Sequence, residues 1–314
     1  MSKRILVIGG TRFFGLRLAE GLLEAGHAVT LATRGRAADP FGDRVQRIRI
    51  DRRDRKAMAA AFERTTWDLV YDQMCYSPRD AAISTAVFAG RVGRYLMAST
   101  IEVYRPLRAA GRAAFGEDDL DLSTVEIGLD HPWDDPARAE VDYDLGKRQA
   151  EAWFHRHPAL PVVAVRIGHV LSGLDDFTGR LAGYVARVRR GEVLRHSQPP
   201  GASSFIHAQG IADFLRWAGE AGFTGPINAA DTGALSALDL HRRVGAVIGR
   251  PVRCEPVPGA HPPAALSAFD FATPYVLDTT RALALGYRFA HTDDWLDAQI
   301  RLHADAANQT QSAA

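Results

Sequence analysis

One short stretch near the start of the chain decides the predicted fold: Ile5-Leu6-Val7-Ile8-Gly9-Gly10-Thr11-Arg12-Phe13-Phe14-Gly15. Its first four residues are apolar and mostly β-branched, which is typical of a strand buried on both faces of a sheet. From Arg12 to Glu24 apolar residues recur at helical spacing, so an amphipathic helix follows directly. Glycines allow a sharp turn between the two, and the open N–H groups of the helix attract an anion. We interpret this turn as a cradle for a dinucleotide pyrophosphate, the alternative being a plain tight turn.

Short apolar strands and amphipathic helices continue to alternate after this cradle. We expect strands near residues 28–33, 45–50, 69–71, 95–97 and 162–167, and helices near 55–63, 79–89 and 137–155. This alternation predicts an α/β fold built on a Rossmann-type, doubly wound parallel sheet with a smaller C-terminal substrate-binding domain. The expected domains are a dinucleotide-binding domain at 1–167 with later contributions from about 204–232, a mainly substrate-binding domain at 168–303, and a flexible tail at 304–314.

The composition is that of an ordinary globular protein, with 314 residues of which 46% are apolar. The formal net charge of +1 argues against a general binder of nucleic acid or membrane surfaces. Cys75 and Cys254 are far apart, so neither a disulfide framework nor a metal site is expected. No apolar run reaches the ~18 residues of a membrane span, and the N-terminus lacks a signal-peptide pattern. We therefore expect a cytoplasmic protein that acts on a small-molecule substrate.

The end of the second strand indicates which dinucleotide is bound. An acidic residue about 20 positions past the cradle would hold the ribose hydroxyls and repel a 2′-phosphate, but this chain has Arg34 in that region. Because Arg34 and Arg12 can offer guanidinium groups to that phosphate, we predict NADP, with NAD as the alternative cofactor. The other interpretation of the two arginines is that they are solvated and bind no ligand. Asp51 is predicted to accept from the adenine amino group or else to cap the next helix. Arg52 beside it is a further predicted cofactor contact.

Two groups of side chains are predicted to carry the chemistry. Tyr143 and Lys147 are four residues apart in a predicted helix, so they share one face. The alternative interpretation is a surface pair without a catalytic role. An ammonium near the phenol favours its ionised form, which lets the pair move a proton on or off a carbonyl oxygen. Ser99 and Thr100 end a predicted strand at the edge where open α/β sheets bind ligands, so their hydroxyls are candidate ligand contacts. The alternative is that each hydroxyl only stabilises a turn or caps a helix. Ile167 ends the following strand and is a predicted cofactor contact.

In this order the motifs resemble the extended short-chain dehydrogenase/reductase superfamily, in its NAD-dependent epimerase/dehydratase branch. The resemblance covers most of the chain and rests on the cradle, Ser99–Tyr104, Tyr143 with Lys147, Val165-Arg166, Ser204–His207 and Asp278–Tyr287. It implies that Thr100, Tyr143 and Lys147 are catalytic and that the nicotinamide lies between the sheet edge and the smaller domain. A homodimer is an expectation that comes from the family alone.

Departures from the family pattern bear on the reaction and the substrate. Dehydratases have Thr-Asp-Glu where this chain has Ile101 between Thr100 and Glu102; isoleucine cannot donate the proton for water elimination, so dehydration is disfavoured. Glu102 remains a candidate base. By alignment, His169 and Ser203 replace the Asn and Arg that commonly touch a substrate diphosphate. The loss of a cationic fork costs several kcal/mol unless another residue replaces it.

The residues predicted to contact substrate are Glu102, His169 and Arg195, with Arg180 and Arg187 as further candidates to replace the missing fork. The predicted protein is an NAD(P)-dependent oxidoreductase or epimerase acting on a hydroxyl or keto carbon of a sugar-nucleotide-like or other small substrate. Net reduction and epimerisation remain equal alternatives. A different class of function is also open: a catalytically silent NAD(P)-binding regulator or nucleic-acid-associated scaffold of the same fold.

Overall fold

The computed structural model describes residues 1–257 and 266–312. The chain divides into two compact units, each assembled from separate segments. The first unit comprises Met1–Arg105, Glu117–Ile167 and Ile211–Ala229. The second comprises Pro106–Gly116, Gly168–Gly210 and Ala230–Ala314.

The first unit is built on a seven-stranded sheet in the order β10-β6-β5-β4-β1-β2-β3. Its strands are β1 (Arg4–Ile8), β2 (Ala28–Thr33), β3 (Gln46–Arg49), β4 (Trp67–Asp72), β5 (Val92–Thr100), β6 (Val162–Ile167) and β10 (Gly225–Ala229). All neighbouring strands are parallel. The order 3-2-1-4-5-6 is that of the dinucleotide-binding Rossmann fold, and β1 and β4 flank the point where the order reverses. The predicted fold class is confirmed.

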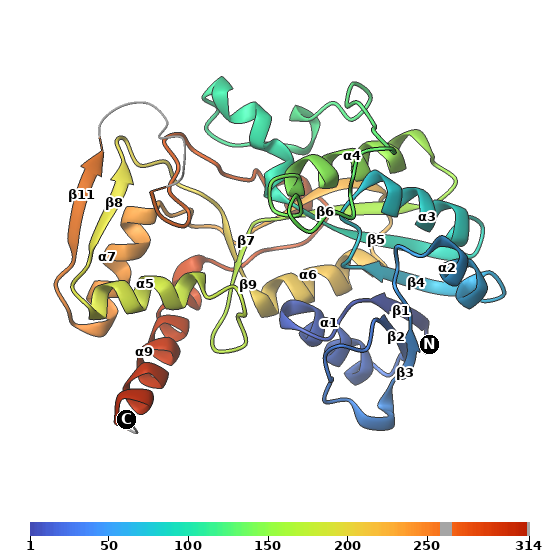
Figure 1. Cartoon of the computed structure of the whole chain (residues 1–314), viewed down its shortest axis with the longest axis horizontal. Helices are drawn as coiled ribbons and strands as arrows, with labels where there is room; N and C mark the ends of the chain where they lie inside the picture. Colours follow the sequence, from blue (N-terminus) through green and yellow to red (C-terminus); the bar gives the residue numbers. More distant parts are fainter. Residues whose placement is uncertain (258–265, 313–314) are drawn as a thin grey trace. The chain divides into compact units, whose positions relative to one another are not determined.

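Helices cover both faces of this sheet, as Figure 1 shows. They are α1 (Phe13–Glu24), α2 (Arg55–Phe62), α3 (Pro78–Phe88), α4 (Tyr143–Arg156) and α6 (Ala208–Glu220). Helices α2, α3 and α4 lie on one face, and α1 and α6 lie on the other. Fully buried side chains such as Leu6, Val70 and Met97 join the strands to the face covered by α2, α3 and α4. This burial leaves the carboxyl ends of the strands as the edge on which a site is built.

Helix α4 starts later than the sequence predicts. Turns occupy residues 137–142, because Asp135 accepts from the N–H groups of Ala137 and Arg138 and holds them outside the helix. The Asp142 carboxylate binds His131 and Arg138, so it provides no side-chain cap. The helix therefore begins at Tyr143, which places this residue in the first turn.

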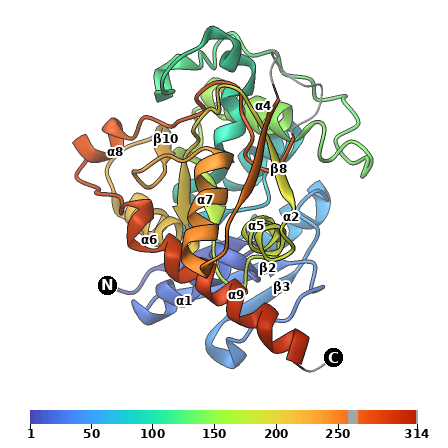
Figure 2. The same ribbon diagram turned by 90° about the vertical axis from the view of Figure 1, so that its left-hand side faces the viewer.

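The second unit contains two small parallel strand pairs and a helical layer. Strand β7 (His169–Leu171) pairs with β9 (Phe205–His207), and β8 (Val193–Ser197) pairs with β11 (Arg253–Val257). The helices are α5 (Arg180–Arg189), α7 (Ala237–Ile248), α8 (Thr280–Ala284) and α9 (Leu296–Ser312). Helices α5, α7 and α9 pack on one another (Figure 2). Short 3-10 helices occupy Gly42–Arg44, Ile101–Ala110, Glu117–Asp119 and Thr292–Asp294.

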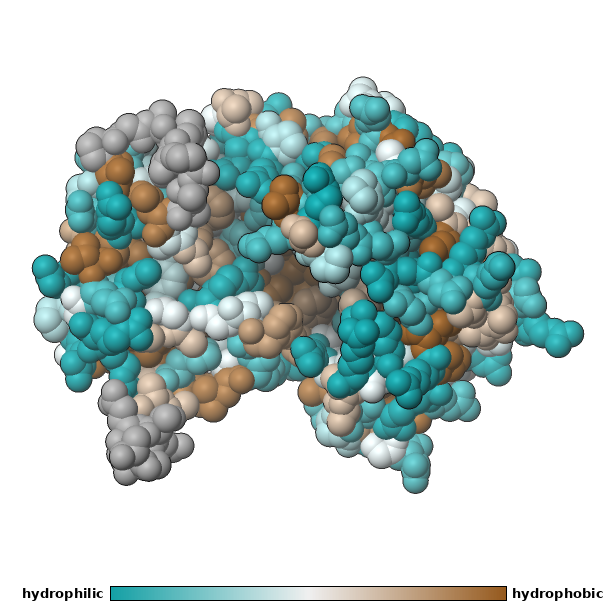
Figure 3. Space-filling view, viewed as in Figure 1, coloured by the Kyte–Doolittle hydropathy of each residue, from teal (hydrophilic) through white to brown (hydrophobic). Residues whose placement is uncertain are grey.

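The end of the chain differs from the expected flexible tail at 304–314. Helix α9 continues through Ser312, and residues 313–314 lie outside the described residues. Alanines at 304, 306 and 307 favour this extension, because alanine has the highest helix propensity. On the face drawn in Figure 3, hydrophilic residues cover most of the surface, with hydrophobic residues scattered among them. No helix within the described residues is long and apolar enough to span a bilayer.

Candidate active site

The glycine cradle has an open backbone geometry. Gly9 and Gly10 adopt φ values of 101° and 83°, which favour glycine because it has no Cβ. Arg12 precedes helix α1 without supplying a side-chain cap, and the first turn of this helix contains no acidic residue. Backbone hydrogen bonds hold the turn: Gly9 N donates to Ala32 O at 3.0 Å, and Gly15 N donates to Arg12 O at 3.1 Å. The start of α1 thus carries neither a side-chain cap nor a carboxylate that would compete with an anion.

Gln73, which follows β4, lies against this cradle. A Cβ at Gly15 would come within 2.1 Å of Gln73 Oε1, so glycine is needed for the amide to pack there. The Nε2 of Gln73 is buried and has no hydrogen-bond partner among the described residues. An unpartnered buried donor is costly in a folded protein unless a ligand or water satisfies it. Gln73 is therefore a candidate ligand-binding residue that the sequence analysis missed.

Two predicted cofactor arginines are exposed in the first unit. Arg12 directly precedes α1 and Arg34 directly follows β2, and neither forms an ion pair with another described residue. Asp51 accepts from Nη2 of Arg53 at 2.9 Å, and this hydrogen bond is the main reason why the Asp51 pKa falls to about 2. The residue that caps α2 is Asp54, whose carboxylate accepts from Ala57 N, so the alternative role of Asp51 as a helix cap is wrong.

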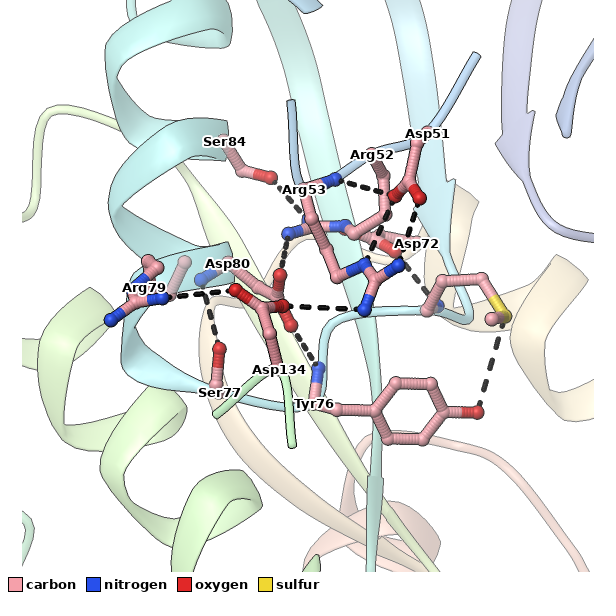
Figure 4. Close-up of polar contacts among 12 residues, drawn as sticks. Asp51, Arg52, Arg53, Asp72, Tyr76, Ser77, Arg79, Asp80, Ser84 and Asp134 are labelled. Carbon is pink, nitrogen blue, oxygen red and sulfur yellow. Dashed lines mark hydrogen bonds and ion pairs between the residues drawn. The ribbon is translucent and has the colours of Figure 1, made fainter. Parts of the chain in front are cut away.

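Arg52 lies in the interior of the first unit, away from solvent, with a side chain 7% exposed (Figure 4). Its guanidinium forms ion pairs with Asp72 and with Asp80, the latter at 2.8 Å. It also donates to Ser84 Oγ at 2.8 Å, and the Tyr95 hydroxyl, which donates its hydrogen to Asp72, lies 2.8 Å from the same Ser84 oxygen. The predicted contact between Arg52 and a cofactor is not what this geometry provides, because the side chain is buried and its guanidinium is paired with Asp72 and Asp80, although its Nε has no hydrogen-bond partner among the described residues.

The Arg52 cluster fixes the loop that follows β4 (Figure 4). Asp72 accepts from Met74 N at 2.8 Å, and Asp80 accepts from Tyr76 N at 2.9 Å. The same two carboxylates hold the guanidinium of Arg52, so the loop backbone is tied to a buried charge. This arrangement positions Tyr76, which sequence reasoning also missed.

Helix α4 is attached to the end of β5 at two points. Lys147 Nζ donates to Ala98 O at 2.6 Å. Ser99 Oγ donates to Glu151, which also accepts from Arg166 Nη2 at 2.7 Å. The predicted cofactor contact Ser99 is therefore 4% exposed and bonded internally. These two hydrogen bonds fix α4 against the strand that ends in Thr100.

Thr100 is the last residue of β5. Its Oγ1 accepts from Glu102 N at 3.2 Å, which is a local turn hydrogen bond. The hydroxyl hydrogen is not used by that bond, so Thr100 retains a donor. Glu102 is half-buried in the 3-10 helix that follows, and Ile167 is buried at the end of β6 beside Thr100 in the strand register.

Two aromatic rings surround the Lys147 ammonium. Nζ lies 4.2 Å from the centre of the Tyr76 ring and 5.8 Å from that of Tyr143. Burial lowers the pKa of Lys147 to about 8, and nearby Cys75 and Asp72 oppose that fall. A Cβ at Gly146 would lie 2.2 Å from the Tyr76 carbonyl oxygen, so glycine here permits the close approach of the loop to α4. The result is a dry ammonium of lowered pKa beside a phenol.

The remaining predicted residues belong to the second unit. His169 is buried on β7, and its Nε2 has no hydrogen-bond partner among the described residues. Ser203 is fully buried and donates to Tyr275 O at 2.9 Å. Arg195 lies 4.0 Å from Glu255, and both side chains are more than half exposed. The structure thus shows Arg195 in a surface ion pair.

The two missed residues share a signal that the sequence contains. Gln73 and Tyr76 directly follow β4, and the carboxyl ends of parallel strands form the ligand-binding edge. The predicted contacts lay at the ends of β5 and β6, and the polar residues after β4 were not among them.

Comparisons with known proteins agree with this architecture. A 2'-dehydrokanamycin reductase from Streptomyces kanamyceticus is 26% identical over 215 residues, or 62% of this chain and 61% of that protein. The chloroplast stem-loop binding protein of 41 kDa b from Arabidopsis thaliana is 36% identical over 85 residues, or 23% of this chain and 22% of that protein. The chain therefore covers less than two thirds of the length of either relative.

Among solved structures, the Bordetella bronchiseptica enzyme WbmG in complex with NAD and UDP has a TM-score of 0.70 and 19% identity. The similarity spans 98% of this chain and 96% of that one, and at this identity it shows a common fold. The model of the NAD-dependent epimerase/dehydratase family matches residues 5–229, which include the cradle, the end of β5 and the Tyr143–Lys147 turn. The chain belongs to the NAD-dependent epimerase/dehydratase family.

Proposed function

We propose that this protein is an NADPH-dependent reductase of a keto carbon in a sugar-like small molecule. The observation that carries the proposal is the buried Lys147 ammonium of lowered pKa beside Tyr143, on a helix tied to the end of β5. Tyrosine and lysine at this spacing form a proton-transfer pair, and buried groups with perturbed pKa values are concentrated in active sites.

The residues of the cradle fit a nicotinamide dinucleotide. Gly9 and Gly10 form a tight turn of positive φ in front of the uncapped start of α1, where backbone can approach a pyrophosphate closely, and Gln73 Nε2 is a buried donor next to Gly15. When bound, this cofactor supplies the hydride. Glycine at position 15 supports the fit, because a side chain there would displace the Gln73 amide.

In the proposed reaction, the protein holds the carbonyl and supplies a proton. The Thr100 hydroxyl donates a hydrogen bond to the carbonyl oxygen and orients it. Tyr143 gives its phenolic proton to that oxygen as the carbon is reduced, and the nearby Lys147 ammonium stabilises the phenolate that remains. A proton from solvent then restores Tyr143.

Reduction is favoured over the other reactions of the family by two observations. Ile101 occupies the place of a dehydratase aspartate and has no proton to donate. The relative that matches over 215 residues is named as a 2'-dehydrokanamycin reductase. Epimerisation requires that the keto intermediate turn over within the site, and no residue described here supports that motion specifically.

The preference for NADP rests on Arg12 and Arg34. Arg34 directly follows β2 and Arg12 directly precedes α1; both are exposed and form no ion pair with a described carboxylate, so their guanidinium groups are available to a 2′-phosphate. Asp51 is held by Arg53, which reduces the repulsion that a free carboxylate would exert on that phosphate. Arg52 contributes indirectly in this proposal, because it anchors the loop that carries Gln73 and Tyr76.

The test is NADPH oxidation with a panel of keto sugars, using Tyr143→Phe and, as a matched control, Tyr287→Phe in the second unit. The Tyr143 variant should lose at least 100-fold in kcat, since general acid catalysis contributes about 10²–10⁴-fold. Its NADPH affinity should stay within about twofold of the wild type. Retained turnover by Tyr143→Phe would show that another group donates the proton.

A second candidate function follows from the relative that is named as a stem-loop binding protein. Its match covers 85 residues, and the net charge of +1 gives this chain little electrostatic attraction for RNA. A gel-shift titration with a stem-loop RNA at physiological salt tests it. Micromolar or tighter binding that NADPH displaces would favour this candidate over the reductase.

A further inference from the structure

A pocket in the helical layer of the second unit involves none of the residues of the candidate active site. It has a volume of about 250 Å³ and lies where the C-terminal ends of α5 and α7 meet α9. We call it the three-helix pocket, and its polar lining residues are Arg189, Arg250, Arg301, Asp305 and Asn308. Ligand pockets usually have volumes of about 300–1,000 Å³, so this one suits a molecule much smaller than a dinucleotide.

The charge of the three-helix pocket is positive, because three guanidinium groups and one carboxylate line it. Arg189 is the last residue of α5, Arg250 follows the residue that caps α7, and Arg301 lies in the first half of α9. The carboxylate is that of Asp305, one helical turn after Arg301. No ion pair joins Arg301 to Asp305 within the part of the chain that the structure describes.

Carboxylates balance two of these guanidinium groups only weakly. Arg250 is exposed, and it donates to the neutral Arg189 O at 3.5 Å, which is beyond the usual range of a hydrogen bond. Arg301 lies 3.9 Å from Asp297, whose carboxylate already accepts from Arg243 Nε at 2.5 Å. Arg250 and Arg301 therefore have donors left for another anion.

The attraction of cations to the C-terminal ends of helices explains only part of this arrangement. It applies to Arg189 and Arg250, which lie at such ends. Arg189 is also fixed against α9, because its Nη1 donates to Ala304 O at 2.7 Å. The dipole of α9 does not favour a cation at Arg301, which lies in the first half of that helix. A bound anion gives a reason for the third guanidinium.

The rest of the lining favours an organic anion with hydroxyl groups over a simple ion. Val247, Ile248 and Ala304 are half-buried apolar residues that line the pocket and pack against the core of the second unit. Apolar surface of this kind is stabilised when the C–H face of a sugar covers it. Asp305 repels an anion, and its carboxylate becomes favourable when the same ligand presents hydroxyl donors.

We propose that the three-helix pocket binds a small sugar phosphate. A phosphate monoester carries a charge of about −1.5 to −2 and three terminal acceptor oxygens, which match three guanidinium groups better than a flat carboxylate does. The sugar hydroxyls donate to Asp305, and the sugar ring packs on Val247 and Ile248. This inference goes beyond the proposed function, because it assigns a second ligand to residues that take no part in the reduction.

The experiment measures equilibrium binding to the full chain by calorimetry. The probes are glucose 6-phosphate, glucose and inorganic phosphate, each titrated with and without NADPH. Arg250→Gln and Arg301→Gln remove one charge each, Arg250→Lys keeps the charge without the planar fork, and Asp305→Asn removes the repulsion. The matched control is Arg242→Gln, since Arg242 is an exposed residue of α7 that does not line the pocket and forms no ion pair with a described carboxylate.

The expected result is that glucose 6-phosphate binds the wild type with a Kd of about 1 mM or tighter, more tightly than inorganic phosphate, whereas glucose does not bind. Arg250→Gln and Arg301→Gln should each weaken the binding of glucose 6-phosphate about 10-fold, and Arg250→Lys should weaken it less. Arg242→Gln should change it less than about twofold. Asp305→Asn should bind inorganic phosphate more tightly than the wild type does and prefer the sugar phosphate less.

Four outcomes would overturn the proposal. They are no binding of glucose 6-phosphate to the wild type, glucose binding as tight as that of the phosphate, equal losses in Arg250→Gln and Arg242→Gln, and displacement of glucose 6-phosphate by NADPH. The last outcome would mean that the phosphate binds in the glycine cradle. If one of the two arginine variants fails to fold, the other carries the test.

Discussion

The Lys147 ammonium lies closer to Tyr76 than to Tyr143, at 4.2 Å from the centre of the first ring and 5.8 Å from the second. The loop after β4 thus covers the lysine with an aromatic face, and Asp80 and Gly146 hold that loop in place. Because burial is the main cause of the lowered Lys147 pKa, the Tyr76 ring is a positioning group that keeps water from the ammonium.

Replacing Tyr76 with Ala should raise the pKa of Lys147. Two effects on this pKa oppose each other. The variant loses a cation–π attraction of about 0.5–1 kcal/mol, which lowers the pKa of Lys147 by less than one unit. It also admits water, which relieves a burial effect that has lowered the pKa from 10.5 to about 8. The second effect is larger, so Lys147 should stay charged to higher pH. The proposed reduction uses the charged ammonium, so the loss of kcat/KM above pH ~8 should move upward by about half a unit or more.

Tyr76→Phe is the matched control, because it keeps the ring and removes only the hydroxyl. Its pH profile should coincide with that of the wild type. Coincident profiles for wild type and Tyr76→Ala would mean that the ring does not shield Lys147, and an equal shift in Tyr76→Phe would assign the effect to the hydroxyl.

Arg52 should be a major contributor to stability, in contrast to its neighbour. Arg52→Met leaves Asp72 and Asp80 as buried carboxylates without a counter-charge, which costs about 3–5 kcal/mol. Arg53→Met breaks an ion pair whose side chains are 45% and 36% exposed, which costs about 1 kcal/mol or less. Urea unfolding of both variants measures the difference. Similar losses in the two would show that the Arg52 cluster is not a desolvated charge network.

A rescue variant separates charge from packing in this cluster. Adding Asp72→Asn and Asp80→Asn to Arg52→Met removes the uncompensated charges and should restore part of the lost stability. No recovery in the triple variant would attribute the loss to packing around Arg52.

The sheet was predictable because its central strands are continuous apolar runs. Residues 5–8 and 162–167 are buried on both faces, so local sequence alone marks them as strands. Strand β10 was not predicted, since it is five residues long and contains Pro226. Proline is tolerated there because β10 lies at the edge of the sheet.

Side-chain environments were less predictable than the strands that carry them. The motif spacing correctly put Tyr143 and Lys147 on one helix, because four residues make about one turn. The burial of Arg52 depends on Asp72 and Asp80, which are 20 and 28 residues away along the chain and meet it only after the sheet forms. Local patterns cannot reveal such pairing, and for the same reason they did not show that Gln73 folds against Gly15.

Arg34→Ala should discriminate between the two cofactors. The wild type should bind NADPH more tightly than NADH, and the variant should lose about 10-fold in NADPH affinity with less than about twofold change for NADH. Arg64→Ala, another exposed arginine, is the control for a general loss of positive charge. Fluorescence titrations with both cofactors provide the comparison, and equal losses for NADPH and NADH would count against contact with the 2′-phosphate.

Gln73→Met should stabilise the protein without cofactor and weaken cofactor binding at the same time. In the free protein Gln73 Nε2 is buried without an acceptor, so an apolar side chain of similar size removes a penalty of about 1 kcal/mol. With cofactor bound, the same substitution removes a donor to the pyrophosphate, and affinity should fall about 10-fold. Urea unfolding of this variant measures the change in stability, and NADPH titration measures the change in cofactor affinity. A variant that is less stable and binds NADPH normally would show that Gln73 is a packing residue, because only a group reserved for a ligand makes the two effects opposite.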